Sequence, residues 1–316
     1  MYHYVRDLKN SRYPDIKGLD RKLFIEQIDY LQKHYNVVTM EEVINAIETG
    51  DQLPQKAALL TFDDAYAEHF TNVFPILHNR KLQGSFYAPA RAIAENLVLD
   101  VNKIHFILAS MPDKQQLLKR TFAELAKYRE EYQLESDDFY FKKLAVDSTY
   151  DPKEVVFLKK LLQKELPESL RNQIIDTLFE AFVGVEESVF SRELYMSKEQ
   201  LQCMISNGMH VGHHGYDHYW LNSLTPEKQR AEIEKGCAFL KDIGVNMQNW
   251  TMCYPYGGYD DALIDLLKEH HCKLGLTTKV AIADVATHNK FELPRLNTND
   301  LPNDNSAEPN KWFYEG

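Results

Sequence analysis

The first part of the chain alternates between strand-like and helix-like patterns. Short apolar runs recur between stretches in which apolar residues repeat every three to four positions, the spacing of an amphipathic helix. We expect strands over residues 1–6, 37–39, 56–62 and 84–88, and helices over residues 19–35, 40–49 and 66–81. Strands that alternate with helices in this way are typical of a parallel α/β architecture.

The alternation stops near residue 95. From there to about residue 195 the apolar spacing is helical, Lys and Glu are abundant, and no stretch has a convincing strand pattern. The alternation then resumes, with helices expected over residues 197–207, 226–243 and 262–270 and strands over 209–212, 252–254, 274–277 and 293–296. We therefore predict an α/β domain in two parts, residues 1–94 and 196–300, with a helical insertion at 95–195 and a polar tail at 301–316.

The helical insertion has three interpretations. Its charged residues are most simply the solvated faces of its helices. The functional alternatives are a lid over a substrate groove and a contact between two copies of the chain in a homo-oligomer. Of the functional alternatives we favour the lid.

Composition and charge narrow the class of protein. The 316 residues include 36 Lys and Arg against 47 Asp and Glu, a formal net charge of -11. Such an acidic chain disfavours non-specific binding to nucleic acid or anionic lipid. The opening residues show no positive n-region followed by an apolar h-region, so we expect no secretory signal, and no apolar run reaches the roughly 20 residues that span a bilayer. We expect a cytoplasmic protein with four reduced cysteines, because Cys203, Cys237, Cys253 and Cys272 form no C-x-x-C pair.

Two adjacent carboxylates end the apolar run of residues 56–62. In strand–helix barrels, reactive side chains lie at the carboxyl ends of the strands. Asp63 and Asp64 occupy such a position, and consecutive side chains at a strand end can point in different directions, so each acid can have its own role. The alternative is that the pair is a turn signal or a helix N-cap.

Histidines cluster after a second expected strand. Residues 209–218 include His210, His213, His214 and His218. His214 and His218 have the i, i+4 spacing that brings two imidazoles to one metal ion if the segment makes a helical turn. His210 and His214 share that spacing, but His210 lies inside the expected strand. The alternative is a polar loop that happens to contain histidine.

A third strand is followed by the sequence Cys-Tyr-Pro-Tyr-Gly-Gly at residues 253–258. Proline and glycine there can turn a backbone N–H toward a ligand, as an oxyanion hole requires. A plain turn explains this segment nearly as well.

Together the three motifs resemble those of the polysaccharide deacetylase family, which is carbohydrate esterase family four with the NodB-homology domain. Residues 61–64 are similar to its motif T-F-D-D-G, residues 214–218 to H-[ST]-x-x-H, and residues 253–257 to R-x-P-Y-G. The likeness covers roughly residues 1–92 and 195–297. It implies a distorted (β/α) barrel, here with a large helical insertion.

The resemblance also implies roles for individual residues. Asp63 is then the general base, and Asp64, His214 and His218 are the metal ligands. Residues 253–257 form one wall of the groove, so Pro255 and Tyr256 contact the substrate and the Tyr256 N–H stabilises the oxyanion. The opening pair Tyr2 and His3 resembles the Tyr-His pair that begins many bacterial catalytic domains. Tyr216 and other aromatic residues near the motifs are candidates to stack on a sugar ring, with ordinary packing as the alternative.

The chain departs from the family pattern at several positions. Ala65 replaces Gly, Gly215 replaces the Ser or Thr that braces the histidine loop, and Cys253 stands where many members have the Arg that orients the base. Arg295 is the candidate for that last role.

The late histidine motif that supplies the general acid has no clear match. This leaves His3, His288 or a shuttle through Asp63 to protonate the leaving amine.

We therefore expect metal-dependent hydrolysis of an N-acetyl group from a sugar, with Asp63 activating a water. Zinc is the first choice of metal, although an Asp–His–His set also accepts cobalt, nickel or iron. A lid and a cytoplasmic location favour a nucleotide- or lipid-linked sugar, used in making a surface polysaccharide. The alternatives are an amidase acting on a non-sugar N-acyl or cyclic amide, and a non-catalytic carbohydrate-binding protein.

Overall fold

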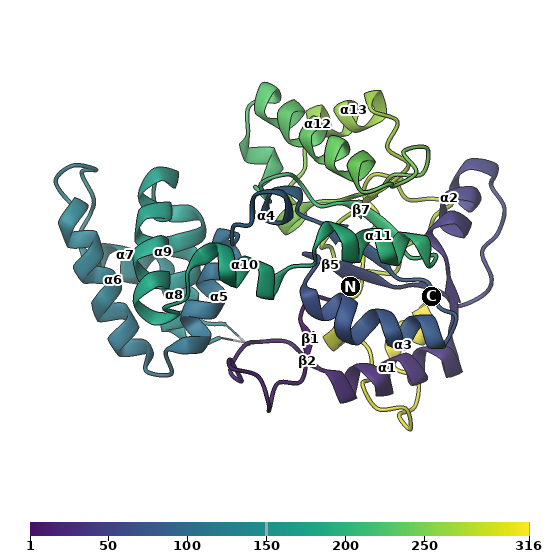
Figure 1. The fold of residues 1–316 in the computed structure, drawn as a ribbon, viewed down its shortest axis with the longest axis horizontal. Helices are drawn as coiled ribbons and strands as arrows, with labels where there is room; N and C mark the ends of the chain where they lie inside the picture. Colours follow the sequence, from purple (N-terminus) through teal and green to yellow (C-terminus); the bar gives the residue numbers. More distant parts are fainter. Residues whose placement is uncertain (149–150, 316) are drawn as a thin grey trace. The chain divides into compact units, whose positions relative to one another are not determined.

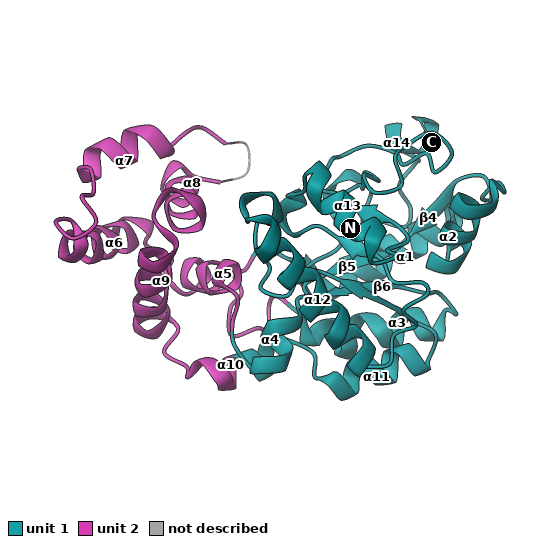
Figure 2. Ribbon diagram, turned by 90° about the horizontal axis from the view of Figure 1, so that it is seen from above, with its two compact units in different colours: residues 1–7, 17–97, 191–316 teal, residues 8–16, 98–190 magenta. Residues whose placement is uncertain are grey.

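The computed structural model describes residues 1–148 and 151–315, which divide into two compact units (Figure 2). The first, here the α/β unit, comprises residues 1–7, 17–97 and the described chain from Ser191 onward. The second, here the helical unit, comprises residues 8–16 and 98–190. The two units are described separately below.

A five-stranded parallel sheet organises the α/β unit. Its strands follow one another in the order β5 (Thr61–Asp63), β6 (Ser85–Ala88), β7 (His210–His213), β8 (Met252–Cys253) and β9 (Gly275–Leu276). The expected parallel α/β architecture is thereby confirmed. Because all five strands run the same way, their carboxyl ends meet at one edge, where the three sequence motifs begin.

The two sides of this sheet are brought together by short extensions. Tyr2 forms a parallel bridge to Phe62 beside β5, and Leu293 forms one to Leu276 beside β9. The terminal ammonium of Met1 then donates a hydrogen bond to the carbonyl of Leu296 over 2.7 Å. The sheet thus curls toward closure. The segment 293–296, expected as a strand, takes part only through the bridge at Leu293.

Two further pairs of parallel strands flank the sheet: β1 (Val5–Arg6) with β2 (Leu19–Asp20), and β3 (Asn36–Val38) with β4 (Ala57–Leu59). The prediction of one strand over residues 56–62 was wrong, because this run changes partners in the middle. β4 pairs with β3, whereas from Leu60, whose carbonyl accepts from Ser85 N–H, the chain pairs with β6.

The helices of the α/β unit begin largely where side-chain caps predict. Thr39 and Ser197 each form a capping box, and Asp20, Thr225 and Asp260 accept hydrogen bonds from first-turn N–H groups. The helices are α1 (Arg21–His34), α2 (Met40–Thr49), α3 (Phe74–Asn79), α4 (Ala90–Glu95), α11 (Lys198–Ser206), α12 (Pro226–Asp242), α13 (Asp261–Glu269) and α14 (Lys311–Glu315). The helix expected over residues 66–81 is instead a π-helical segment, His69–Val73, followed by α3. Helix α12 packs beside α13 and against α4 and β7 (Figure 1).

The helical unit has its own aromatic core. Its helices are α5 (Asp100–Ser110), α6 (Lys114–Tyr128), α7 (Asp137–Leu144), α8 (Lys153–Lys160) and α9 (Glu168–Phe182), and the chain leaves the unit within α10 (Glu187–Leu194). Tyr13 packs edge-on against Phe106 and Phe190, with ring centroids 4.9 and 5.9 Å apart. Residues 8–16 therefore belong to this unit, which their sequence pattern does not indicate. In residues 1–148 and 151–315, no helix is long and apolar enough to cross a membrane.

Candidate active site

The adjacent acids Asp63 and Asp64 have separate partners. Asp63 is the last residue of β5, and its two carboxylate oxygens accept hydrogen bonds of 2.8 Å from the guanidinium of Arg295. Asp64 follows with φ of 74°, a left-handed conformation that turns the chain away from the strand. Its Oδ1 atom lies 3.4 Å from His214 Nε2 and 3.3 Å from His218 Nε2. The structure thus gathers all three proposed metal ligands, and all are buried.

The chemistry of this group fits a divalent metal. One ligand atom from each of Asp64, His214 and His218 lies within 4.8 Å of the others. Within the described chain, Asp64 Oδ1 has no hydrogen-bond partner, and a buried carboxylate oxygen without a partner is costly unless a cation is nearby. His214 Nδ1 lies 2.8 Å from the Cys253 carbonyl. Donation there leaves the lone pair on Nε2, the atom that faces Asp64.

A second group of possible ligands shares His214 and adds Asp63 and Cys253. Arg295 lies against both of these, since its Nη2 also donates to Cys253 Sγ over 3.1 Å. A permanent positive charge at that place opposes a second cation. The Asp64 group is therefore the better metal site.

Tyr66 holds the other oxygen of Asp64. Its hydroxyl donates a 2.6 Å hydrogen bond to Asp64 Oδ2, which directs Oδ1 toward the histidines. The Tyr66 ring is fully buried and stacks on Tyr4 at 4.1 Å. The sequence does not mark Tyr66 as a site residue, because it stands at the start of an expected helix, where a tyrosine usually packs in the core.

Local charges keep both acids ionised. Burial by itself raises the pKa of Asp63, but the charge and hydrogen bonds of Arg295 outweigh burial and hold the pKa below its usual range. Burial also raises the pKa of Asp64, but the imidazoles of His214 and His218 close to Oδ1 outweigh burial and lower this pKa well below its ordinary value.

The histidine motif is an irregular loop. It does not make the helical turn that was the condition for the i, i+4 pairing, because Gly215 adopts φ of 72°, a conformation that breaks a helix. His218 is also left-handed, with φ of 58°. The two histidines that precede the ligands face the interior. His213 Nδ1 accepts the Gly215 N–H over 2.9 Å, and His210 is buried in β7.

The third motif places an aromatic surface beside the ligands. Tyr256, in the 3₁₀ turn Pro255–Gly257, has φ of 56°, and its ring lies 4.8 Å from that of His218. The indole of Trp220 stacks on Tyr256 with ring centroids 4.7 Å apart and planes 4° from parallel. The ring of Tyr256 thus lies next to a proposed metal ligand. Tyr216 instead donates its hydroxyl to Glu95 over 2.7 Å.

The opening segment brings His3 to the same place. Hydrogen bonds between residue 2 and the backbone of Thr61 and Asp63 align the chain with β5. His3 Nε2 consequently lies 3.9 Å from Asp63 Oδ2, and the His3 side chain is 48% exposed. The other candidate, His288, is in an exposed loop where its Nδ1 accepts from the Asp284 N–H.

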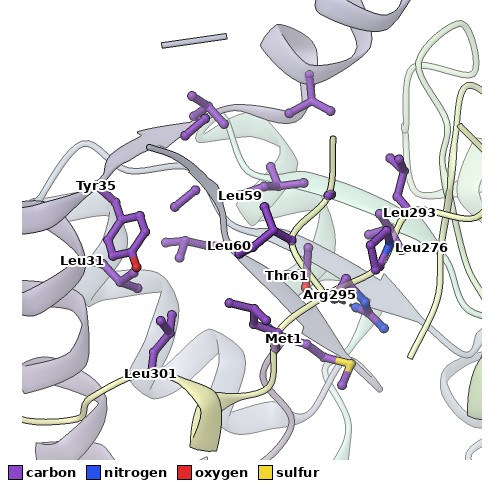
Figure 3. Close-up of a pocket in the computed structure, with 18 of the residues that line it drawn as sticks. Met1, Leu31, Tyr35, Leu59, Leu60, Thr61, Leu276, Leu293, Arg295 and Leu301 are labelled. Carbon is purple, nitrogen blue, oxygen red and sulfur yellow. Dashed lines mark hydrogen bonds between the residues drawn. The ribbon is translucent and has the colours of Figure 1, made fainter. Parts of the chain in front are cut away.

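Arg295, which binds Asp63, also lines a pocket of about 210 Å³ (Figure 3). Thr61 and Arg295 line one side, and the Arg295 guanidinium donates to Thr61 Oγ1 over 3.2 Å. Much of the remaining wall is aliphatic and includes Leu31, Leu59, Leu276 and Leu293. Such surroundings strengthen the attraction between Arg295 and Asp63.

Comparisons with known proteins agree with this geometry. A family model described as polysaccharide deacetylase matches residues 164–275, about a third of the chain. A putative polysaccharide deacetylase of Bacillus subtilis, YxkH, is 26% identical over 89 residues, which cover 28% of this chain and 32% of that protein. The poly-beta-1,6-N-acetyl-D-glucosamine N-deacetylase of Escherichia coli is 43% identical over 53 residues, 16% of this chain and 8% of that protein. The chain therefore matches only a small part of these relatives' lengths.

Solved structures of deacetylases share the fold. Streptococcus pyogenes deacetylase PplD in complex with acetate superposes with a TM-score of 0.56 at 16% identity, covering 93% of this chain and 88% of that one. IcaB from Ammonifex degensii gives 0.54 at 20% identity, covering 95% and 91%. The expected distorted barrel with helical additions is confirmed by these likenesses. This chain is thus similar in part of its length to the polysaccharide deacetylase family, and its strand-end motifs agree with that likeness.

Proposed function

We propose that this protein removes the acetyl group from an N-acetylated sugar in a metal-dependent reaction. One observation carries the proposal. Two consecutive acids at a strand end have different partners, Arg295 for Asp63 and two histidines for Asp64. A hydrolase that uses one acid as a base and the next as a metal ligand requires this division.

Each proposed role follows from the surroundings of the residue. Asp64, His214 and His218 would hold the ion, which when bound would supply Lewis acidity to water and to the acetamide carbonyl. Asp63, ionised and held in orientation by Arg295, would accept the proton of the attacking water. The Tyr256 N–H would stabilise the negative charge that develops on the carbonyl oxygen. Zinc is the proposed ion because one carboxylate and two imidazoles form a common zinc set.

We assign delivery of the second proton to His3. Its imidazole lies 3.9 Å from Asp63 and is half exposed, so it can exchange protons with both solvent and the site. Replacing His3 by Gln should lower kcat for acetate release by about a hundredfold, within the usual range for general acid catalysis. His288→Gln is the matched control, and equal activity of the two variants would contradict the assignment.

The substrate class is drawn from the chemistry and from the relatives. The relative in Escherichia coli is named for poly-beta-1,6-N-acetyl-D-glucosamine, so N-acetylglucosamine oligomers are the first substrates to test. Nucleotide- and lipid-linked N-acetylated sugars remain the proposal from the sequence, and non-sugar N-acyl and cyclic amides belong in the same screen.

The test combines metal content with acetate release. We expect the wild type to hold about one ion per chain and to release acetate from a sugar. Asp63→Asn should keep the ion and lose activity, whereas His214→Ala should lose both. A wild type that binds no metal would contradict the proposal. If the protein hydrolyses only non-sugar amides, the proposed mechanism stands but the proposed substrate class is wrong.

A further inference from the structure

The loop that carries the two proposed histidine ligands is held by a carboxylate from a neighbouring helix. We propose that Glu232, on α12, is the positioning residue of the metal centre, and that its carboxylate fixes the backbone between His214 and His218. This inference rests on the proposed function, since it concerns the same ion.

The contacts of Glu232 are specific. Its Oε2 atom accepts hydrogen bonds from the N–H groups of Tyr216 and Asp217, over 2.8 and 3.0 Å. Glu232 is only 5% exposed. A buried carboxyl oxygen that accepts hydrogen bonds from two backbone N–H groups satisfies both of them and fixes their positions. The two N–H groups belong to consecutive residues midway between the proposed ligands.

The opposite side of the loop is held as well. The carbonyl of Gly215 accepts from the Ala90 N–H over 3.3 Å, and that of Tyr216 accepts from the Arg91 N–H over 2.9 Å. Helix α4 thus binds the loop's carbonyls while Glu232 binds its N–H groups. This matters because His218 adopts φ of 58°, which a non-glycine residue keeps only when its surroundings enforce it.

Position 215 shows why a carboxylate is needed here. The related motif H-[ST]-x-x-H has a hydroxyl residue at this position, but this chain has Gly215 with φ of 72°. A Cβ atom there would lie 3.2 Å from Pro255 Cγ, 3.3 Å from the His218 nitrogen and 3.4 Å from Glu232 Oε2. No hydroxyl at position 215 can brace the loop. The carboxylate of Glu232 takes that role from α12.

The experiment measures metal binding separately from activity. Metal-free wild type, Glu232→Leu and Glu232→Gln are titrated with Zn²⁺ against a chromophoric chelator. Glu234→Leu is the matched control, because Glu234 is on the same helix with a side chain that is 54% exposed.

We expect Glu232→Leu to bind Zn²⁺ about 10- to 100-fold more weakly, the usual effect of losing a group that orients metal ligands. Glu232→Gln keeps an acceptor oxygen and should retain most of the affinity, and Glu234→Leu should match the wild type. A changed visible spectrum of bound Co²⁺ in Glu232→Leu would show altered ligand geometry, which general destabilisation would not produce.

The results that would overturn this inference differ from those that would overturn the proposed function. A folded Glu232→Leu with wild-type Zn²⁺ affinity and Co²⁺ spectrum overturns the inference, and so does an equal loss in Glu234→Leu. If circular dichroism shows that Glu232→Leu does not fold, Glu232→Asp decides, because its shorter side chain cannot reach both N–H groups and should show the same loss. A wild type that binds no ion overturns the proposed function and this inference together. A wild type whose binding is insensitive to Glu232 overturns the inference alone.

Discussion

Arg295 and Asp63 meet in two parallel hydrogen bonds, each 2.8 Å long, and their side chains are only 6% and 3% exposed. The paired geometry fixes the plane of the carboxylate as well as its charge. It follows that the orientation of the proposed base depends on a residue 232 positions further along the chain.

Replacing Arg295 by Met should therefore affect both stability and activity. The variant leaves the buried carboxylate of Asp63 without its guanidinium partner, which costs about 3–5 kcal/mol in the free energy of unfolding. Acetate release should fall at least a hundredfold, since Asp63 is then misoriented. Urea unfolding and an acetate assay measure the two effects.

The double variant Asp63→Asn with Arg295→Met supplies the control. It removes both charges, so its stability should recover toward that of the wild type while its activity stays absent. A double variant as unstable as the sum of the single variants would show that the ion pair is not the source of the loss.

Tyr66→Phe tests how Asp64 is oriented. The change removes only the hydroxyl that donates to Asp64 Oδ2, and the buried ring remains. We expect metal affinity to fall about tenfold or more, as for other residues that hold a metal ligand in place. Competition with a chelator measures the change. Tyr4→Phe is the control, because it removes a hydroxyl from the ring that stacks on Tyr66. An equal loss of metal affinity in Tyr4→Phe would indicate that disturbed packing is the cause.

The motif residues of the site could be predicted from the sequence because each lies directly after an apolar run. Asp63 lies at the end of a buried strand. Parallel strands bring their carboxyl ends together, so His214 and Tyr256, which come after other strands of the same sheet, are expected near Asp63. Glu232 and Tyr66 could not be predicted in this way. The contact of Glu232 depends on how α12 packs beside the histidine loop, and that of Tyr66 depends on the left-handed turn at Asp64 and Ala65. No local pattern specifies either arrangement.

Two features of the fold also could not be predicted from the local sequence pattern. The run at residues 56–62 is mostly apolar, and its pattern does not mark the change of partner from β3 to β6. Residues 8–16 have no periodicity of their own, and they belong to the helical unit because Tyr13 packs against its aromatic core.

Asp100 gives the helical unit a pH-dependent stability. Burial raises the pKa of this carboxyl from 3.8 to about 6, although Lys103 acts in the opposite direction. Between these two values the unfolded chain has lost the proton while the folded chain keeps it, so stability falls as the pH rises through this window. Asp100→Asn should be more stable than the wild type at pH 8, by about 2 kcal/mol.

The comparison is made by urea unfolding at pH 8 and at pH 4.5. The difference between wild type and variant should shrink markedly at the lower pH, where the folded wild type is protonated. A difference that does not change with pH would contradict the assignment to Asp100.

The cysteines should differ sharply in reactivity. Cys203 is exposed and Cys237 is half buried, whereas Cys253 and Cys272 are buried and burial raises the pKa of both thiols. Ellman's reagent should modify Cys203 quickly and Cys237 slowly in the native protein. The other two should react only after denaturation.

The variant Cys203→Ser identifies the fast phase, which should disappear. Rapid labelling of Cys253 in the native protein, detected by mass spectrometry of its peptide, would mean that reagent reaches the space between Arg295 and the histidines.

Four of the nine non-glycine residues that the described chain holds at positive φ are Asp64, Ala65, His218 and Tyr256. Each such residue costs on the order of 1 kcal/mol. The placement of these groups thus lowers the stability of the fold, a trade-off between stability and activity. Asp64 and His218 are proposed metal ligands and Tyr256 supplies the proposed oxyanion N–H, so directed evolution toward thermal tolerance would find its most accessible gain at Ala65.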